Sequence, residues 1–299
     1  MTATTATSPG RRQHTAPRRR IWTFRRMSRR AVGIGWGVLA WICGLVLFIP
    51  VGWMVITAFK PQAQAATFPP RISFHPTLSE FRTVLSNNGI GLGGFFAHSA
   101  EATIASTAIV LLLGVPAAYA LSIRPVRSWR DALFFFLTTK MLPLAAAIMP
   151  LYVIAKDLHL LDHVAVLVLL YTSMNLPVAI WMLRSFMLEI PSELLEAARL
   201  DGASLGREIV EVMLPSVAPG IAATALICII FAWNELFLAT NLTATSASTL
   251  PVFIAAIPNE GLFYGTLAAE ATIASLPVVL IGWIAQRQLV RGLSLGAIK

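Results

Sequence analysis

Residues 97–121 read AHSAEATIASTAIVLLLGVPAAYAL, and this apolar run decides the class of fold. Glu101 is its one acidic residue, and the run contains no lysine or arginine. A helix rises about 1.5 Å per residue, so this run exceeds the roughly 20 residues that cross a hydrocarbon core about 30 Å thick. The sequence therefore predicts a transmembrane helix here.

The rest of the chain repeats this pattern. Six apolar runs are long enough to span a membrane, at 32–59, 97–121, 132–154, 164–187, 216–240 and 267–290. Hydrophobic residues make up 57% of the 299 residues and charged residues 12%, against about a quarter charged in soluble domains. This composition also excludes a disordered chain. We expect an all-α polytopic membrane protein with six transmembrane helices.

The positive charge lies mostly ahead of the first span. Nine of the 23 lysines and arginines fall between Arg11 and Arg30. When the connecting segments are assigned to alternate sides, 18 basic residues share the side of the N-terminal tail and four lie on the other. Basic residues favour the cytoplasmic side, so we expect both termini to be cytoplasmic, and the charge does not indicate nucleic-acid binding. The predicted organisation is a basic cytoplasmic tail at 1–31, a six-span domain at 32–290 and a cytoplasmic C-terminal tail at 291–299.

The first run needs to be distinguished from a cleaved targeting signal. Ser28-Arg29-Arg30 resembles a twin-arginine signal. The apolar run that follows is about 28 residues long, whereas a signal peptide core has about 7–15. We therefore expect this segment to be retained as a helix.

Four ionisable residues fall inside the expected spans: Glu101, Lys140, Glu235 and Glu270. Charged groups in a membrane are costly and mark candidate functional positions. The three glutamates are expected at one depth near the outer ends of their spans. Either they line a wet vestibule that opens outward, or each reaches the interface or pairs locally. The role of Lys140, which lies deeper, stays open.

The cytoplasmic segment 189–219 reads EIPSELLEAARLDGASLGREIVEVMLPSVAP and is too structured for a passive connector. Pro191-Ser192 predicts a helix start, and Asp201-Gly202 predicts its end. A second helix is expected from about Arg207, leading into the fifth span at Leu214-Pro215. The sequence predicts a short helix-turn-helix at the membrane surface, at about 189–215.

This segment resembles the EAA motif of membrane subunits of ATP-binding-cassette (ABC) importers. Glu196-Ala197-Ala198, Gly202 and Leu214-Pro215 match its spacing, with Val212 in place of isoleucine. The resemblance to the maltose-type carbohydrate permeases extends from about residue 32 to 299 and includes several shorter motifs. These are Ala117-Ala118-Tyr119-Ala120-Leu121, Met149-Pro150-Leu151-Tyr152, Asn175-Leu176-Pro177 and Trp233-Asn234-Glu235.

The resemblance implies the fold of a type I ABC importer transmembrane domain and a role as one half of a sugar or polyol import channel in a prokaryotic cytoplasmic membrane. It implies a second permease subunit, two ATP-binding subunits, and an extracytoplasmic solute-binding protein. It also implies that the loop docks on the ATPase subunit through a defined set of residues: Glu196, Ala197, Ala198, Asp201, Gly202, Leu214 and Pro215. On this basis we expect Gly202→Asp and Glu196→Lys to uncouple the ATPase, and Asp162→Lys on the outer side to be much milder.

The chain itself shows no nucleotide site. A phosphate-binding loop needs a Gly-Lys pair, and the four lysines follow Phe59, Thr139, Ala155 and Ile298. We expect no directly bound cofactor, with ATP and Mg²⁺ on the partner subunits. His159 and His163 have zinc-ligand spacing beside Asp162, but a turn lacks the rigidity of a helix, so we expect no metal. The chain is not expected to be an enzyme.

Five residues are candidates for the substrate pathway: Phe231, Trp233, Asn234, Glu235 and Asn175. Aromatic faces beside an amide and a carboxylate suit sugar rings and hydroxyls, whereas the alternative is a set of aromatic residues at the lipid interface. The remaining alternatives for function are an ABC permease for a non-sugar solute, an ion-coupled transporter and an intramembrane enzyme that uses Glu101, Glu235 and Glu270.

Overall fold

The computed structural model describes residues 21–86, 92–124, 126–141, 143–256 and 263–295, and these residues form helices and turns without a strand. The chain divides into two units, Met1–Trp53 and Met54–Lys299. Tail residues 1–20 and 296–299, and 257–262 of an outer loop, lie outside the described residues. The all-α membrane fold is confirmed, with five helices long and apolar enough to cross a membrane and a sixth that is broken.

The first unit consists of most of α1 (Ile21–Ala58), which begins at Ile21 rather than at residue 32, so the described end of the basic segment is helical. The second unit starts with the last turn of α1. Two short helices follow, α2 (Gln62–Ala65) and α3 (Ser79–Ser86).

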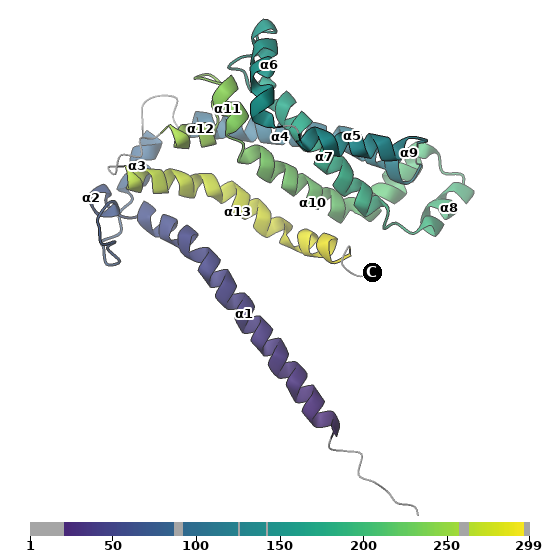
Figure 1. The fold of residues 1–299 in the computed structure, drawn as a ribbon, viewed down its shortest axis with the longest axis horizontal. Coiled ribbons are helices and arrows are strands. Elements are labelled where there is room, and N and C mark those ends of the chain that lie inside the picture. The colour runs from purple at the N-terminus through teal and green to yellow at the C-terminus, as the bar shows by residue number, and fades with distance from the viewer. Residues whose placement is uncertain (1–20, 87–91, 125, 142, 257–262, 296–299) are drawn as a thin grey trace, which may run out of the picture. The chain divides into compact units, whose positions relative to one another are not determined.

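The second unit is built around four long helices: α4 (Leu92–Ser122), α7 (Val164–Met187), α10 (Leu214–Trp233) and α13 (Tyr264–Leu295). Helix α10 contacts the other three, and α4 packs along α7 (Figure 1). Gly220 of α10 faces Phe186 of α7 so closely that a Cβ would overlap the ring. Small residues permit this approach, as is usual between membrane helices. Helix α13 continues to Leu295, past the end expected at residue 290.

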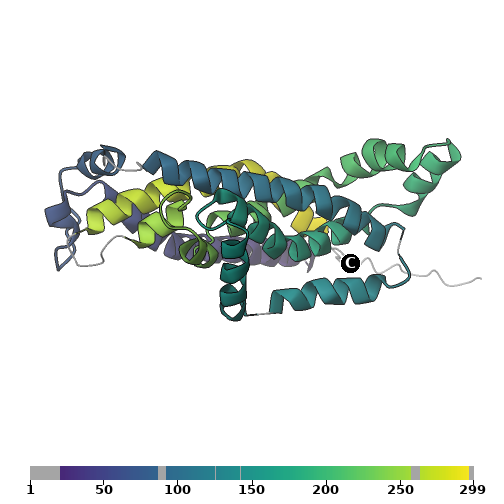
Figure 2. The same cartoon turned by 90° about the horizontal axis from the view of Figure 1, so that it is seen from above.

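The third span is broken, contrary to the single helix expected at 132–154. Helices α5 (Trp129–Met141) and α6 (Leu144–Asp157) meet at 91° (Figure 2). Pro143, in an extended conformation, caps the start of α6. Proline has no N–H with which to continue a preceding helix, which explains why a new helix starts after Pro143.

The helix pair α5–α6 carries the chain from one end of the second unit to the other. At its start, Trp129 stacks under the guanidinium of Arg184, with 4.5 Å between the guanidinium carbon and the ring centroid. The Nε of Arg184 donates to the carbonyl of Leu121 at the end of α4. At its far end, the turn after α6 bonds to 244–247, beyond the opposite end of α10. The pair therefore serves as the sixth crossing, although it is bent.

The fifth span also differs from the expected 216–240. The chain is one continuous helix over Leu205–Trp233, formed by α9 (Leu205–Arg207), a π-helical segment η1 (Glu208–Met213) and α10. The second loop helix expected from about Arg207 is thus the start of the span itself. Beyond Trp233 the chain turns into α11 (Phe237–Leu242) and later α12 (Leu250–Ala255).

Candidate functional site

The loop that the sequence predicts to be cytoplasmic consists of α8 (Ser192–Leu200), a tight turn and the start of the long helix. The amide of Gly202 donates to the carbonyl of Arg199, and the amide of Ala203 donates to that of Ala198. Gly202 has φ +79°, the left-handed conformation that glycine adopts without a steric penalty. These two hydrogen bonds and the left-handed glycine make a Schellman motif. This motif explains why a glycine stands at position 202.

The next helix starts with a side-chain cap. The Oγ of Ser204 accepts a hydrogen bond from the amide of Arg207, which satisfies one of the free donors of a helix start. Two caps separated by Asp201–Ala203 fix the angle between α8 and the long helix. The loop is therefore a defined projection at the end of the second unit (Figure 1).

Helix α8 has two different faces. Leu195 is buried, and Arg199 lies one turn further along the same face. Glu196, Ala197 and Asp201 are exposed, as are Gly202 and Pro215, while Ala198 and Leu214 are half-buried. Leu200 is 89% exposed, the largest fraction among the loop's apolar side chains. Leu200 therefore projects from the exposed face of α8, next to the exposed Ala197 and Glu196.

The buried face holds a polar cluster that the sequence did not reveal, formed by Glu208 with Tyr119, Arg124 and Arg199. Oε1 of Glu208 accepts from the hydroxyl of Tyr119 and from Nη2 of Arg199, both at 2.7 Å. Oε2 accepts from Nε of Arg199 at 2.9 Å and from Nη2 of Arg124 at 3.0 Å. The Glu208 carboxylate raises the pKa of the Arg199 guanidinium above its usual value. This cluster joins α4, α8 and η1.

The five pathway candidates lie in different environments. Asn175 is fully buried in α7 and donates from Nδ2 to the carbonyl of Cys228, 3.4 Å away. Trp233 is buried, and its indole N–H donates to the carbonyl of Ala274 in α13. Glu235 is buried, and its carboxylate accepts from the amides of Leu238 and Ala239, which caps the start of α11. Asn175 and Trp233 therefore join neighbouring helices, whereas Glu235 is a local helix cap.

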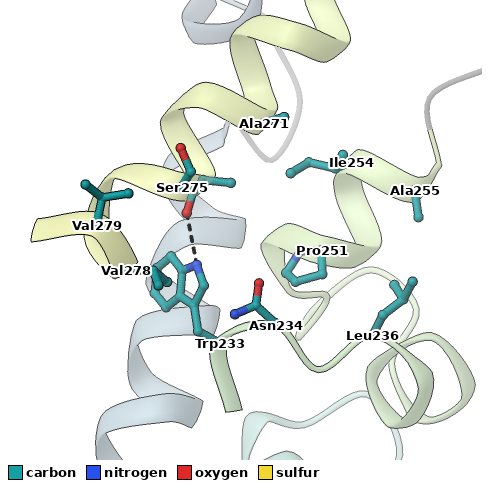
Figure 3. Close-up of a pocket in the computed structure, with 11 residues that line it drawn as sticks. Trp233, Asn234, Leu236, Pro251, Ile254, Ala255, Ala271, Ser275, Val278 and Val279 are labelled. Atoms are coloured by element: carbon teal, nitrogen blue, oxygen red, sulfur yellow. Dashed lines mark hydrogen bonds between the residues drawn. The ribbon is translucent and has the colours of Figure 1, made fainter. Parts of the chain in front are cut away.

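Phe231 and Asn234 are the two exposed candidates. The Nζ of Lys140 lies 5.8 Å from the centroid of the Phe231 ring, which gives that lysine a cation–π contact. Asn234 lies at the edge of an open cavity of about 450 Å³ between the end of α10, α12 and α13 (Figure 3). Its walls are mostly apolar, with Ser275 and the Asn234 amide as polar groups. Trp233 lines the same cavity as Asn234, whereas Phe231, Glu235 and Asn175 are not among its lining residues.

The three glutamates expected at one depth also differ. Glu101 is exposed, Glu235 pairs locally as a cap, and Glu270 is buried in α13. Within the described residues, Oε2 of Glu270 has no hydrogen-bond partner. The three side chains do not share one kind of environment.

The turn that holds His159, Asp162 and His163 is tied to a segment about 80 residues further along the chain. The carboxylate of Asp162 accepts from the amides of Ala244, Thr245, Ser246 and Ala247 at 2.8–3.2 Å. Asp162 also has φ +58°, which few residue types adopt readily. That Asp162→Lys affects ATPase binding and uptake less than the loop variants stays a prediction, but a lysine could not accept the hydrogen bonds from these four amides.

In the part of the chain that the structure describes, no three His, Cys, Asp or Glu side chains converge to form a candidate metal site. The side chain of His163 contacts the carbonyl of Leu161 instead.

Two features were missed by sequence reasoning. Glu208 and Glu211 are both acidic and three residues apart, yet the former is fully buried and the latter is 63% exposed in a surface pair with Arg207. The only sequence signal for Glu208 is that it lies nine residues after Arg199, across a Gly-containing turn. Leu200 could have been found, because a leucine just before Asp-Gly at a helix end has little to pack against.

Comparisons with known proteins agree with this geometry. Residues 110–295 match the model of the family described as binding-protein-dependent transport system inner membrane component. A probable ABC transporter permease protein, y4oR of Sinorhizobium fredii, is 33% identical over 273 residues, which cover 91% of this chain and 98% of that protein. The trehalose transport system permease protein SugB of Mycobacterium tuberculosis is 34% identical over 275 residues, or 88% and 97% of the two chains.

A further relative and a solved structure extend the likeness. The diacetylchitobiose uptake system permease protein DasC of Streptomyces coelicolor is 30% identical over 282 residues, covering 91% of this chain and all of that protein. The crystal structure of a bacterial ABC transporter involved in the import of the acidic polysaccharide alginate has a chain that aligns with a TM-score of 0.69. At 24% identity over 87% of this chain and 97% of that chain, it shows a shared fold.

Proposed function

The chain belongs to the binding-protein-dependent transport system inner membrane component family, and from this premise we propose that it forms one half of the translocation pathway of an ATP-driven sugar or polyol importer. It is a multi-pass inner membrane permease of an ABC importer, a class that works with other ABC subunits and a substrate-binding protein. The observation that carries the coupling role is the capped loop with its exposed Leu200.

We assign docking on the ATPase subunit to the exposed face of this loop. Glu196, Ala197 and Leu200 form the face of α8 opposite Leu195, and Gly202 holds the turn beside it. Burying a leucine is worth about 1.5–3 kcal/mol, so Leu200 alone can supply one to two orders of magnitude in affinity. ATP and Mg²⁺ bind on the two ATPase subunits, and both termini of this chain lie on the same cytoplasmic side.

A saccharide substrate is supported by the names of two relatives, the trehalose permease SugB and the diacetylchitobiose permease DasC. Of the five pathway candidates, we propose that Phe231 and Asn234 contact the substrate directly. Trp233, Glu235 and Asn175 act on the pathway through the helices that they hold.

The test of coupling compares Leu200→Ala with Leu85→Ala, an exposed leucine of α3. Membranes that contain the whole importer are solubilised, and the ATPase subunit is captured through a tag on this chain. We expect Leu200→Ala to weaken capture at least tenfold and to abolish uptake, with Leu85→Ala unchanged. Equal capture by the two variants would contradict the docking assignment.

The substrate class is tested in cells that lack only this chain. We expect loss of uptake of one labelled saccharide from a panel that includes trehalose and diacetylchitobiose, restored by the wild-type chain. Loss of uptake of a non-sugar solute alone would point to the alternative ABC substrate. Uptake that a protonophore blocks while cellular ATP is maintained would overturn ATP coupling and favour an ion-coupled transporter.

A further inference from the structure

The polar cluster around Glu208 joins three elements that are far apart in the sequence. Tyr119 comes from the end of α4, Arg124 from the turn directly after it, Arg199 from α8, and Glu208 from the π-helical segment. Four hydrogen bonds fill both oxygens of one carboxylate, at 2.7–3.0 Å. No acceptor of Glu208 is left over for a ligand or a partner chain.

The members of the cluster differ in exposure, and this difference shows that the cluster links the loop to the interior. The Glu208 side chain is completely buried, whereas the side chains of Arg124 and Arg199 are 49% and 38% exposed. Two guanidinium groups thus reach from the surface to one interior carboxylate. Charge-assisted hydrogen bonds of this kind, with one bidentate arginine, are strong and have a fixed geometry.

One face of helix α8 packs against the rest of the chain, and the opposite face is exposed for docking. Leu195 and Arg199, four residues apart, point to the rest of the chain, while Glu196 and Leu200 lie on the exposed side. Arg199 therefore lies behind the docking face and does not belong to it. A change at Glu208 alters how α8 is held without altering the surface that a partner would contact.

Glu208 also lies near the start of a long helix that connects the loop to the opposite end of the second unit. It belongs to the continuous helix Leu205–Trp233, which at 1.5 Å per residue extends about 40 Å. This helix ends beside Asn234 and the cavity of Figure 3. Single π-turns inside long helices frequently occur at functional positions. A displacement of α8 reaches the far end only if α8 and this helix move together.

We propose that Glu208 is a positioning residue that locks α8 to the second and fifth spans, so that motion of the docked loop moves both spans as one body. The inference rests on the proposed function, because it needs an ATPase subunit to move the loop. The buried carboxylate accepts from Arg199 of the loop, from Tyr119 at the end of the second span and from Arg124 just after that span, all at the same time.

The test uses Glu208→Gln in the assembled importer, with Glu211→Gln as the matched control. Glu211 lies on the same segment, is 63% exposed and pairs with Arg207 at 3.5 Å, so the control removes an equal charge without touching the cluster. Three quantities are measured in proteoliposomes: ATPase subunit captured per permease, ATP hydrolysed, and labelled substrate transported.

We expect Glu208→Gln to capture the ATPase subunit within twofold of wild type, but to transport about tenfold less substrate per ATP hydrolysed, a typical size for coupling between sites. Glu211→Gln is expected to match wild type in all three measurements. Transport and hydrolysis that fall in proportion to the captured ATPase would show a merely structural role and would overturn the proposal. Unchanged transport per ATP would overturn it as well.

Two milder variants decide the question if Glu208→Gln does not accumulate in the membrane. Tyr119→Phe removes one hydrogen bond, and Arg199→Lys keeps the charge but loses the bidentate geometry. Both variants are expected to transport less substrate per ATP than wild type, with a loss smaller than tenfold. Wild-type values in both variants would reject the positioning role of Glu208. If the wild-type chain captures no ATPase subunit, the proposed function itself fails. If the wild-type chain captures the ATPase subunit but the variants transport as much substrate per ATP as wild type, only the positioning role of Glu208 fails.

Discussion

Gly202 is a residue whose backbone conformation, rather than its contacts, limits substitution. Its φ of +79° lies in the left-handed region, and an added Cβ would meet no atom of the chain within 4 Å. Any cost of Gly202→Ala in the isolated chain therefore comes from backbone strain, about 1–2 kcal/mol. Gly206 gives a matched comparison, since it also has open space around it but lies in a helix.

We therefore predict opposite effects for the two alanine variants. Gly202→Ala should lower the free energy of unfolding by roughly 1 kcal/mol. Gly206→Ala should leave it unchanged or raise it by up to about 1 kcal/mol, because alanine favours the helix. Thermal unfolding of the purified permease complex measures both. A destabilisation of equal size in the two variants would mean that the left-handed turn does not limit this position.

At the scale of elements, Asp162 holds the turn after α6 to the segment that follows α11. Its carboxylate lies opposite four successive amides, which lower the pKa of this carboxyl well below its usual range. Because the folded-state pKa is depressed, the stabilisation is present above the ordinary aspartate pKa of about 3.9 and is lost as the pH falls below it. The outer clamp is therefore expected to stay intact between pH 7 and pH 5.

We predict that Asp162→Asn opens this clamp. Asparagine tolerates the left-handed backbone but has one acceptor oxygen and no charge. Hydrogen bonds to charged groups contribute about 1.5–3 kcal/mol, so amide exchange at 244–247 should accelerate at least tenfold. Hydrogen exchange followed by mass spectrometry measures this, with Asp157→Asn, an exposed aspartate at the end of α6, as control. No acceleration in Asp162→Asn, or the same acceleration in both, would reject the clamp.

The elements also show what the sequence could predict. Apolar length located all six crossings, because length and hydropathy are properties of consecutive residues. It did not predict the bend in the third, since prolines also lie inside helices that stay continuous: Pro50, Pro116, Pro150, Pro177, Pro215, Pro219 and Pro277. Pro143 alone marks the α5–α6 break, and only packing against other helices distinguishes it.

The candidate site shows the same limit. The EAA spacing located the loop and its left-handed glycine, because a turn is a local feature. The pairing of Glu208 with Tyr119 and Arg124 joins residues 89 and 84 positions apart. No pattern in a single sequence reports such a contact. The pathway residues were chosen by chemical type, and the structure separates the exposed Phe231 and Asn234 from three buried side chains.

At the scale of the whole molecule, the hydrogen bonds show which connections share an end of the second unit. Glu208 and Arg184 bond to the end of α4, so the loop at α8 and the start of α5 share one end. The opposite end holds the start of α4, where Ser99 accepts from the amide of Leu250, together with the Asp162 clamp. This arrangement requires the bent α5–α6 pair to cross, because a re-entrant loop would return the chain to its starting side.

We predict that labelling places these ends on opposite sides of the membrane. Cys43 and Cys228 are first replaced by alanine, and single cysteines are introduced at the exposed positions Ser128, between α4 and α5, and Ser73, between α2 and α3. A membrane-impermeant maleimide should label Ser73→Cys in cells whose inner membrane is intact, and Ser128→Cys only after that membrane is permeabilised. The charge asymmetry of the sequence and the coupling role of α8 both require this result. Labelling of Ser128→Cys in intact cells would place the Glu208 cluster and the docking loop outside the cell, where no ATPase subunit could reach them.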